Sequence, residues 1–592
     1  MSVIVGISAH YHDSACCIIK DGILVAAAEE ERFTRTKHDA GIPARAFRYC
    51  LSEARVTIND ITCIAYYENP VKKVARQLWA GLPDILTDPR RRFRIDPGRA
   101  EADIRQSLGF EGPVEFVDHH LSHAASAFFF SGYPEAALLT VDGVGEWATT
   151  TYGHAAGDSI DLFEEVEFPH SLGLLYSGVT AYLGFDVNDA EYKVMGLAPY
   201  GEPRYADKVR KLVEVQEGGQ YRLEMSYFDF MSRDRMYSDR LCQLFGQAPR
   251  VAESELSQFH KDVASSVQVV LEEILLEKVR YLHERHPGEH LCMAGGVALN
   301  CVANGRIHRE GPFTNLFVQP AASDAGGALG AAAIACVRRT GSRPSTEPLR
   351  HVYLGPSYSN QQVSQLIHNS PLREAVLDYS GDQAGLIRAS AERLADGKVI
   401  GWFQGRMEFG ARALGARSIL ADPRRPEMRD RINALVKMRE AFRPFAPAVL
   451  EAKMSGHFDL AYPSPYMLET CRVTSPLPLP AVTHVDGSAR VQTVGKDANP
   501  RFHALLVEFD RLTDCPILLN TSFNLRGDPI VLDPVDAIWT FAISNIDTLV
   551  IEDYVVDRGI EPAAWTHLIA MLGARNTKRR AAAEAVNVYT FL

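Results

Sequence analysis

The sequence lacks several features that would define whole classes of protein. Its ten cysteines include no Cys-x-x-Cys pair, and the adjacent Cys16 and Cys17 would point to opposite faces of a strand, a poor geometry for a disulfide. A chain of 592 residues needs no disulfide to fold, so we expect reduced thiols and a cytoplasmic protein. Met1 leads directly into VIVGIS without a basic segment, which predicts that there is no secretory signal.

Long hydrophobic runs and an excess of positive charge are also missing. The longest stretch of low polarity, residues 326–337, is rich in Ala and Gly and too short to span a bilayer, so we expect no membrane partner. The formal net charge of −12 offers no overall electrostatic footprint for DNA or RNA, which argues against a nucleic-acid partner. The composition, with 46% hydrophobic and 23% charged residues, is that of a globular protein, and the length predicts two large domains.

The N-terminal half contains a repeated layout of short strands. VIVGIS, ACCII and ILVAAAEEE follow one another, with the polar loop HYHDS after the first strand and a tight Asp-Gly turn after the second. AALLTVD and ATTTYGH begin a second set, which continues with another strand after a Gly-Asp turn. Two such sets suit the duplicated fold of the actin, sugar-kinase and Hsp70 superfamily, and two unrelated hairpins are the alternative.

Two histidines and two aspartates are candidate metal ligands. His119 and His123 lie four positions apart, which places both imidazoles on one face of a predicted helix. Asp142 ends a buried strand, and Asp324 opens a helix of small residues. Two imidazoles and two carboxylates suit Fe²⁺, Mn²⁺ or Zn²⁺, and the alternative is a pair of structural histidines.

Glycine-rich turns follow two of the predicted strands. Gly295 and Gly296 come directly after a strand, with Asn300 four residues later, and Gly326 lies at a predicted helix start. Glycine allows a nucleotide to approach the backbone, and free N–H groups at a helix start suit phosphate, although tight strand-to-helix packing would also require glycine. His12, in the loop HYHDS, is either a general base near neutral pH or a histidine bonded within its turn.

The C-terminal half is locally basic. Residues 401–450 hold ten Lys and Arg against five Asp and Glu, although the chain as a whole is acidic. Arg412 and Arg443 lie among Gly, Phe and Pro, a setting in which arginine usually binds phosphate or carboxylate, whereas Arg424, Arg425 and Arg429 better fit a solvated face. Ser522 follows a buried strand within a polar loop that suits a small polar ligand.

Several motifs, taken in order along nearly the whole chain, resemble those of the NodU/CmcH-type O-carbamoyltransferases, the family of the tobramycin- and saxitoxin-type enzymes. They are HDSA, EEERFTRTKH, DHHLSHAAS, TVDGVGE, YKVMGLAPYG, GGVALN, SDAGGALG, GRMEFGARALGARS, KMREAFRPFAP and NTSFN. One departure is Ala411, where relatives often have proline, and this change removes no chemical group.

The resemblance implies an α/β protein of two domains. Residues 1–350 would form an actin-like (ASKHA) domain similar to threonylcarbamoyl transferases, and residues 351–592 a YrdC-like domain. Carbamoyl phosphate and ATP would give carbamoyl-adenylate in the second domain. The carbamoyl group would then pass to a hydroxyl of a small-molecule natural product in the first.

The resemblance also implies roles for individual residues. His12 matches the base for the acceptor hydroxyl, and His119, His123, Asp142 and Asp324 match the ligands of an iron-type metal, Fe²⁺ before other ions. Several residues fall in motifs that line an N-terminal nucleotide site: Lys37, Gly295, Gly296, Asn300 and Gly326. Mg²⁺ could accompany ATP at this site. A second set of residues matches a pocket for carbamoyl phosphate and the adenylate: Arg412, Lys437, Arg443, Arg490 and Ser522.

Two other functions compete with this one. A fused tRNA threonylcarbamoyl transferase would need a basic face for tRNA, which a net charge of −12 does not favour. A sugar or acid kinase would use only the actin-like domain and would leave the arginine-rich half unexplained.

Overall fold

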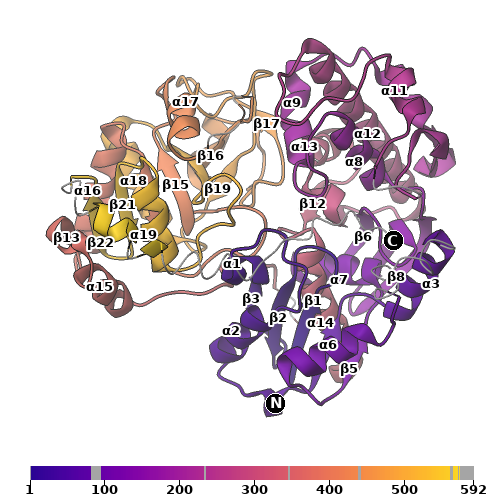
Figure 1. Ribbon diagram of the computed structural model, residues 1–592, viewed down its shortest axis with the longest axis horizontal. Coiled ribbons are helices and arrows are strands. Elements are labelled where there is room, and N and C mark those ends of the chain that lie inside the picture. Colours follow the sequence, from indigo (N-terminus) through magenta and orange to yellow (C-terminus); the bar gives the residue numbers. More distant parts are fainter. Residues whose placement is uncertain are drawn as a thin grey trace. The chain divides into compact units, whose positions relative to one another are not determined.

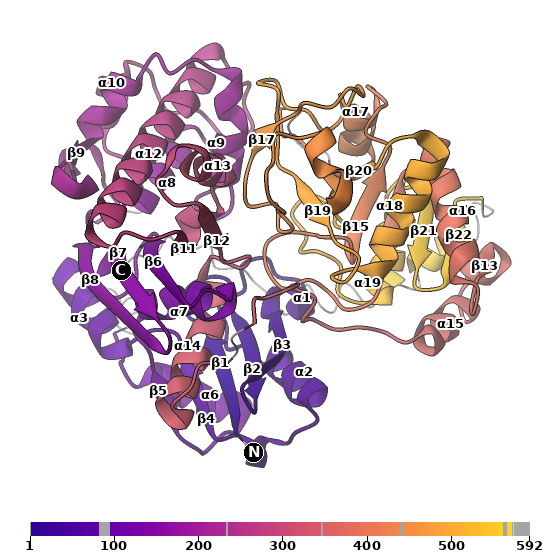
Figure 2. The same cartoon turned by 180° about the vertical axis from the view of Figure 1, so that it is seen from behind.

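The computed structural model describes residues 2–81, 95–231, 235–344, 347–437, 440, 442–559, 565–570 and 572–573 (Figures 1 and 2). The side chain of Lys437 lies outside the described part. The chain forms two compact units. Unit 1 holds the described residues of 1–30 and 38–349, and unit 2 holds those of 31–37 and 350–585.

Unit 1 contains two five-stranded sheets. The first has the order β3-β2-β1-β4-β5, and its strands are β1 (Val3–Ser8), β2 (Ala15–Lys20), β3 (Ile23–Glu29), β4 (Cys63–Tyr66) and β5 (Val114–Phe116). The second has the order β12-β11-β6-β7-β8, and its strands are β6 (Glu135–Val141), β7 (Ala148–Ala156), β8 (Ser159–Glu167), β11 (His290–Ala294) and β12 (Asn315–Val318).

The two sheets have the same topology. In the first, β1 pairs antiparallel with β2 and parallel with β4, and in the second, β6 pairs antiparallel with β7 and parallel with β11. The outer strands β3 and β8 are antiparallel to their neighbours, and β5 and β12 are parallel to theirs. The predicted duplication and the actin-like fold class of unit 1 are thereby confirmed.

Each sheet is followed by a helix that occupies an equivalent place in its half. α7 (His119–Ser131) follows β5, and α14 (Asp324–Thr340) follows β12, and the two helices pack against each other. A Cβ atom on Gly330 of α14 would lie 1.7 Å from the carbonyl oxygen of Ser122 in α7. The small residues of SDAGGALGAAA therefore permit a contact that brings the starts of both helices together.

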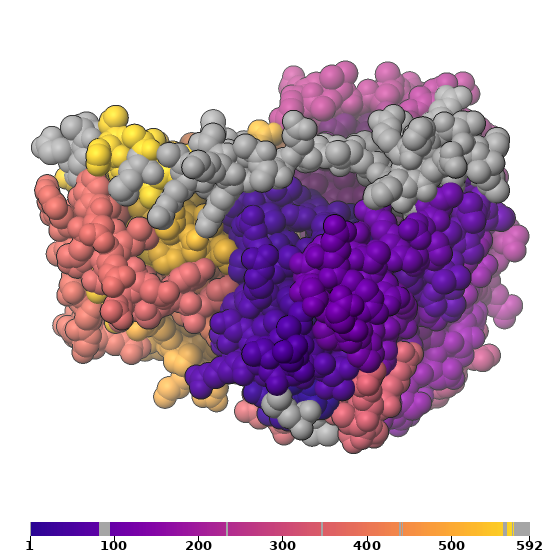
Figure 3. All heavy atoms as spheres, turned by 60° about the horizontal axis from the view of Figure 1, so that its bottom comes forward, coloured from indigo at the N-terminus to yellow at the C-terminus, as the bar shows by residue number. Residues whose placement is uncertain are grey.

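Unit 1 has further helices and strands beside this pair and the two sheets. They are α2 (Ala44–Ala54), α3 (Pro70–Gly81), α6 (Arg99–Leu108), α8 (Leu172–Tyr182), α9 (Glu191–Leu197), α10 (Ala206–Val209), α11 (Asp239–Phe245), α12 (Gln258–Arg285), α13 (Cys301–Glu310) and a small hairpin of β9 (Val213–Val215) and β10 (Tyr221–Leu223). On the face that Figure 3 shows, the first half of unit 1, coloured indigo to purple, forms a continuous surface.

Unit 2 is built on an eight-stranded sheet with the order β13-β22-β21-β14-β15-β20-β16-β19. The strands are β13 (Val376–Asp378), β14 (Ile400–Phe403), β15 (Arg417–Ala421), β16 (Ala446–Leu450), β19 (Gln492–Val494), β20 (Ile517–Ser522), β21 (Thr548–Ile551) and β22 (Tyr554–Asp557). The other elements are α15 (Asn360–His368), α16 (Gln383–Ala395), α17 (Met428–Ile432), α18 (Pro500–Thr513), α19 (Pro534–Ile543), a π-helical turn (Asn433–Lys437) and a two-stranded ribbon of β17 (Cys471–Arg472) and β18 (Ser488–Ala489).

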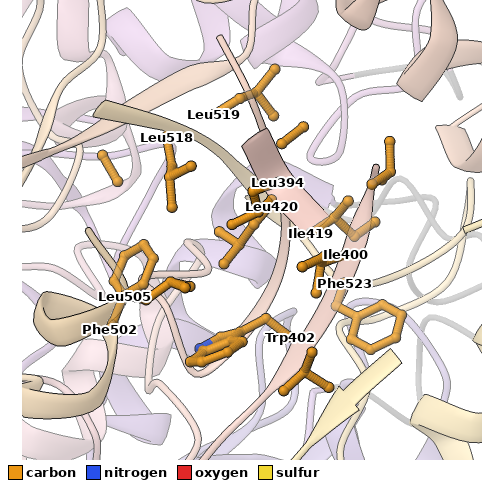
Figure 4. Close-up of a cluster of buried hydrophobic side chains, with 14 of the residues drawn as sticks. Leu394, Ile400, Trp402, Ile419, Leu420, Phe502, Leu505, Leu518, Leu519 and Phe523 are labelled. Atoms are coloured by element: carbon orange, nitrogen blue, oxygen red, sulfur yellow. The ribbon is translucent and has the colours of Figure 1, made fainter. Parts of the chain in front are cut away.

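The core of unit 2 lies where α16, α18 and α19 pack on this sheet. Trp402 of β14 is fully buried in the same cluster as Phe502 and Leu505 of α18 (Figure 4). A Cβ atom on the neighbouring Gly401 would lie 2.7 Å from the ring of Phe523, so Phe523 packs on the opposite face of β14. The likeness of unit 2 to YrdC-type enzymes stays a prediction.

The segment Glu31–Lys37, which we call the strap, packs with unit 2 although the chain on both sides of it belongs to unit 1. It contains most of α1 (Glu30–Thr34). Phe33 packs against Met407, Ala413, Ile530 and Leu532. Arg35 donates hydrogen bonds to the carbonyl oxygens of Ile530 (2.6 Å) and Pro529 (2.7 Å). The division between the units is therefore not a single point in the chain.

Two expectations from the sequence concern the chain as a whole. All ten cysteines lie among the described residues, and none forms a disulfide. Among the helices that the structure describes, none combines the length and the apolar character that a bilayer crossing requires.

Candidate active sites of the two units

His119, His123, Asp142 and Asp324 meet in the interior of unit 1. The Nε2 atoms of His119 and His123 lie 3.0 Å apart, and His119 Nε2 lies 3.2 Å from Asp142 Oδ2. Asp324 Oδ1 lies 3.7 Å from each of these nitrogens. All four side chains are buried, and four ligand atoms, one from each, lie within 4.8 Å of one another.

The duplicated fold explains why these residues meet. His119 begins α7 and Asp324 begins α14, the two helices that occupy equivalent places in the halves of unit 1. Asp142 directly follows β6, and its Oδ1 accepts a hydrogen bond of 2.7 Å from the backbone N–H of Gly296. Glu146, from the loop after β6, accepts a hydrogen bond of 3.0 Å from the backbone N–H of His119 and so fixes the start of α7.

The charges of this cluster are mutually dependent. Burial alone would lower the pKa of His119, but its hydrogen bond to Asp142 and the charge of Asp324 raise it to about 9. Burial alone would raise the pKa of Asp142, but the neighbouring histidines hold it well below its usual range. Asp324 Oδ1 is buried and has no hydrogen-bond partner among the described residues. Such convergent imidazole nitrogens and carboxylate oxygens fit a divalent transition-metal ion.

His12 lies in the loop between β1 and β2, the counterpart in the first half of the loop that follows Asp142. Its Nδ1 lies 3.0 Å from Asp13 Oδ2, and its side chain is 21% exposed. Burial alone would lower the pKa of His12, but the carboxylate of Asp13, followed by that of Asp324, raises it to about 9. The pKa of His12 is therefore higher than that of an unperturbed imidazole, which is about 6.5.

The predicted nucleotide glycines have packing reasons of their own. Gly295 has a φ of +94°, and a Cβ atom there would lie 2.2 Å from the carbonyl oxygen of Val141. A Cβ atom on Gly326 would lie 2.2 Å from the carbonyl oxygen of Ala321. Asn300 caps α13 and exchanges two hydrogen bonds of 3.0 Å with Gln268. Their roles in nucleotide binding stay predictions.

Lys37 belongs to a different unit from the other predicted nucleotide residues of the N-terminal half. It is the last residue of the strap and so packs with unit 2, whereas Gly295, Gly296, Asn300 and Gly326 belong to unit 1. The motif EEERFTRTKH gives no sign of this division, because it depends on contacts with residues several hundred positions away.

The sheet of unit 2 gathers the other predicted ligand-binding residues at one edge. Ser522 ends β20, and β20 runs antiparallel to both β15 and β16, so the starts of β15 and β16 lie beside its end. β19 runs parallel to β16 and starts at the same edge. Arg412, Arg443 and Arg490 precede β15, β16 and β19 by a few residues each. Four residues distant in sequence therefore reach the same edge of one sheet.

The contacts at this edge differ from one residue to the next. Within the described residues, Nε of Arg490 is buried without a hydrogen-bond partner. The Arg443 guanidinium lies 3.7 Å from the carboxylate of Glu440. Ser522 Oγ donates a hydrogen bond of 2.7 Å to Asn524. Lys437 ends the π-helical turn, and its side chain lies outside the described residues.

The sequence did not identify some residues of these sites. Glu408 accepts hydrogen bonds from the backbone N–H groups of Leu414, Ala416 and Arg417 and shapes the loop that carries Arg412. A lone acid inside GRMEFGARALGARS is the signal that could have identified it. His38 was not singled out either, although it stands beside Lys37 in a motif that carries the resemblance.

Comparisons with known proteins match two family models to different parts of the chain. Residues 3–89 and 99–333 match the family described as Carbamoyltransferase N-terminus, and residues 391–558 match Carbamoyltransferase C-terminus. An uncharacterized protein of Synechocystis sp. is 44% identical to this chain, and the alignment covers 95% of this chain and 98% of that protein. The nodulation protein NolNO of Sinorhizobium fredii is 39% identical, and the alignment covers 95% of this chain and 81% of NolNO.

Likeness to solved structures is weaker. The structure of component A of (R)-2-hydroxyglutaryl-CoA dehydratase from Acidaminococcus fermentans aligns with this chain at 16% identity and a TM-score of 0.30. The alignment covers 56% of this chain and 96% of component A. A likeness at this level carries no functional argument.

Proposed function

The chain belongs to the carbamoyltransferase family, and from this premise we propose that it is an ATP-dependent O-carbamoyltransferase. Unit 2 would convert carbamoyl phosphate, ATP and water into carbamoyl-adenylate, pyrophosphate and inorganic phosphate. Unit 1 would then transfer the carbamoyl group to a hydroxyl of a small-molecule natural product and release AMP.

The observation that carries this proposal is the convergence of Arg412, Arg443, Arg490 and Ser522 at one edge of the unit 2 sheet. Carbamoyl phosphate and ATP are both anions, and an acidic protein needs a local cationic site to bind them. A buried guanidinium nitrogen without a partner, as in Arg490, gains a hydrogen bond when an oxyanion binds. Lys437 would add a further charge to this pocket.

Unit 1 offers a base and a metal site for the transfer step. An aliphatic hydroxyl is a poor nucleophile, and a neutral His12 can take its proton as the new C–O bond forms. His119, His123, Asp142 and Asp324 would hold a divalent ion, for which we propose Fe²⁺. When bound, such an ion supplies Lewis-acid polarisation and charge neutralisation at the reacting group.

The nucleotide part of the intermediate needs a place near this base. Gly295, Gly296, Asn300 and Gly326 lie around the same end of the second sheet and the start of α14 and would line it. Lys37 at the end of the strap, and Mg²⁺ bound with ATP, would serve the phosphates. A tRNA acceptor is less well supported, because a net charge of −12 provides no general attraction for nucleic acid.

A two-stage assay tests the proposal. Purified protein with ATP should release pyrophosphate only when carbamoyl phosphate is present, and mass spectrometry of a panel of polyhydroxyl compounds should then find a product that has gained one carbamoyl group. Pyrophosphate release that ignores carbamoyl phosphate would contradict the adenylation step. Modification of tRNA but of no small molecule would favour the alternative acceptor.

A further inference from the structure

Asp13 is held by more groups than a turn residue requires. Its Oδ1 lies 2.7 Å from His38 Nδ1, and its Oδ2 accepts a hydrogen bond of 2.7 Å from Ser323 Oγ. The same Oδ2 lies 3.0 Å from Nδ1 of His12, at an angle outside good hydrogen-bond geometry. In unliganded enzymes, catalytic hydrogen bonds are often misaligned in this way. One carboxylate thus stands between two imidazoles.

His38 has a carboxylate at each ring nitrogen. Its Nδ1 faces Asp13, and its Nε2 lies 3.0 Å from Asp189 Oδ1. An ionised carboxylate only accepts hydrogen bonds, so two ionised partners would require both nitrogens of His38 to donate, which is the imidazolium form. Burial alone would raise the pKa of Asp13, but the two histidines hold it well below its usual range. The resulting series His12–Asp13–His38–Asp189 alternates positive and negative groups.

The backbone under this series is strained. Asp13, His38 and Asn188, which precedes Asp189, have φ values of +55°, +54° and +66°, a region that side-chain-bearing residues rarely adopt. Strained residues persist where the surrounding structure fixes them, and they are concentrated at functional sites.

Holding the loops together does not require these side chains. Backbone hydrogen bonds from His10 to Ala40 (2.8 Å) and from Ser14 to Asp39 (2.9 Å) already join the β1–β2 loop to the segment after His38. Ser14 Oγ adds a third, of 2.6 Å, to the carbonyl oxygen of Gly41. The ionic series therefore lies beside a connection that the backbone makes by itself.

We propose that Asp13 and His38 are positioning residues for His12: Asp13 accepts a hydrogen bond from Nδ1–H of His12, and His38, held by Asp189, keeps Asp13 ionised and in place. This inference rests on the proposed function, in which His12 is the base. In the transfer step the acceptor oxygen bonds to the carbamoyl carbon, the bond from that carbon to the AMP oxygen breaks, and AMP leaves with the electron pair. The hydroxyl proton moves to His12 Nε2, while the Nδ1 proton stays between His12 and Asp13.

The first measurement is spectroscopic and needs no acceptor. In protein labelled with nitrogen-15 histidine, the signal of His12 is assigned by its loss in His12→Gln and read at a pH above the pKa of His12. We expect the Nδ1–H tautomer in the wild type and a shift toward the Nε2–H tautomer in Asp13→Asn, as follows when a triad aspartate is changed to asparagine. Asp21→Asn is the matched control, because Asp21 also has a positive φ of +49° but lies in the exposed β2–β3 turn.

The second measurement is a double-variant cycle on carbamoyl transfer to the compound that the polyhydroxyl panel identifies. Asp13→Asn should lower kcat by about 10²–10⁴-fold with little change in the acceptor KM, and His38→Gln should lower it less. Pyrophosphate release should be unchanged. In the His12→Gln background, Asp13→Asn should cause no further loss, because it acts only through His12.

The outcomes separate this inference from the proposed function. An unchanged His12 tautomer in Asp13→Asn, or an equal loss of rate with and without His12, would overturn the positioning role. A wild-type protein that shows the Nδ1–H tautomer but releases no pyrophosphate would overturn the proposed function and leave the relation between Asp13 and His12 standing.

Discussion

At the scale of single residues, His12 differs from what its sequence context suggests. Imidazole ordinarily titrates near pH 6.5, and a histidine in a loop is expected to be neutral at physiological pH. Burial favours that neutral form here, but the adjacent Asp13 carboxylate and the charge of Asp324 raise the pKa to about 9. The residue is therefore mostly protonated at neutral pH.

The pH dependence of carbamoyl transfer follows from this shift. A base must be neutral to take a proton, so the transfer rate should rise about tenfold for each pH unit below the pKa and level off above about 9. The measurement is kcat/KM for the acceptor as a function of pH, with pyrophosphate release in parallel as the control. A midpoint near 6.5 would contradict an ionised Asp13 beside His12.

Two arginines at the unit 2 sheet edge should be needed for adenylation. Arg443→Ala and Arg490→Ala each remove a guanidinium from the sheet edge that we propose binds the oxyanions, and we expect pyrophosphate release to fall by about 10²–10³-fold. Arg424→Ala is the matched control, since Arg424 already makes hydrogen bonds of 3.0 and 2.8 Å to Asp422. Normal carbamoyl-AMP formation by both edge variants would contradict the site.

At the scale of elements, the duplicated halves of unit 1 explain the candidate metal site better than any single motif. α7 and α14 hold equivalent places and cross closely at Gly330, so the residues at their starts face a common point. The loops after β1 and β6 also hold equivalent places, and they carry His12 and Asp142. The base and the metal cluster are thus products of one repeated arrangement.

Elemental analysis tests the metal cluster. We expect close to one divalent ion per chain in the wild type and loss of the ion in a His119→Ala/His123→Ala double variant, because two of the four ligand groups are removed. A variant of His120, whose Nδ1 is hydrogen-bonded to Thr140 at 2.6 Å, is the neighbouring control and should retain the ion. Wild-type protein that remains fully active after chelation would assign these residues a structural role.

At the scale of the whole molecule, the strap makes unit 2 depend on a segment from the first forty residues. Phe33 and Arg35 pack against the segments around Met407 and Ile530, next to the loop that carries Arg412. The chain enters and leaves the strap through residues of unit 1, since Glu30 and His38 both belong there. Separating the halves at residue 350 would therefore remove part of unit 2.

Weakening the strap should impair adenylation. In the full chain, Phe33→Ala/Arg35→Ala removes apolar packing and two hydrogen bonds, and we expect unit 2 to be destabilised by about 1–3 kcal/mol, with reduced pyrophosphate release. Thermal unfolding and the adenylation assay measure both effects. Thr36→Ala, within the same strap, is the control. Unchanged adenylation in the double variant would show that the strap does not support the Arg412 loop.

The sequence by itself determined the features that depend on near neighbours. The four-residue spacing of His119 and His123, the repeated strand layout and the small residues of α14 are all encoded locally, because strand alternation and helical periodicity are set by adjacent positions. These local features were enough to predict the α/β class, the duplication and a candidate metal cluster. The ordered motifs sufficed for the family.

Only the tertiary structure decided the features that arise from distant contacts. The pKa of His12 depends on burial and on Asp324, more than three hundred positions away, and the strap joins unit 2 through Ile530. The common edge reached by Arg412, Arg443, Arg490 and Ser522 follows from the strand order, and no local pattern specifies that order. His38 acquires its two carboxylate partners only when Asp189 folds against the β1–β2 loop. Charge, burial and strand order are properties of the assembled fold, and short-range sequence patterns carry little information about them.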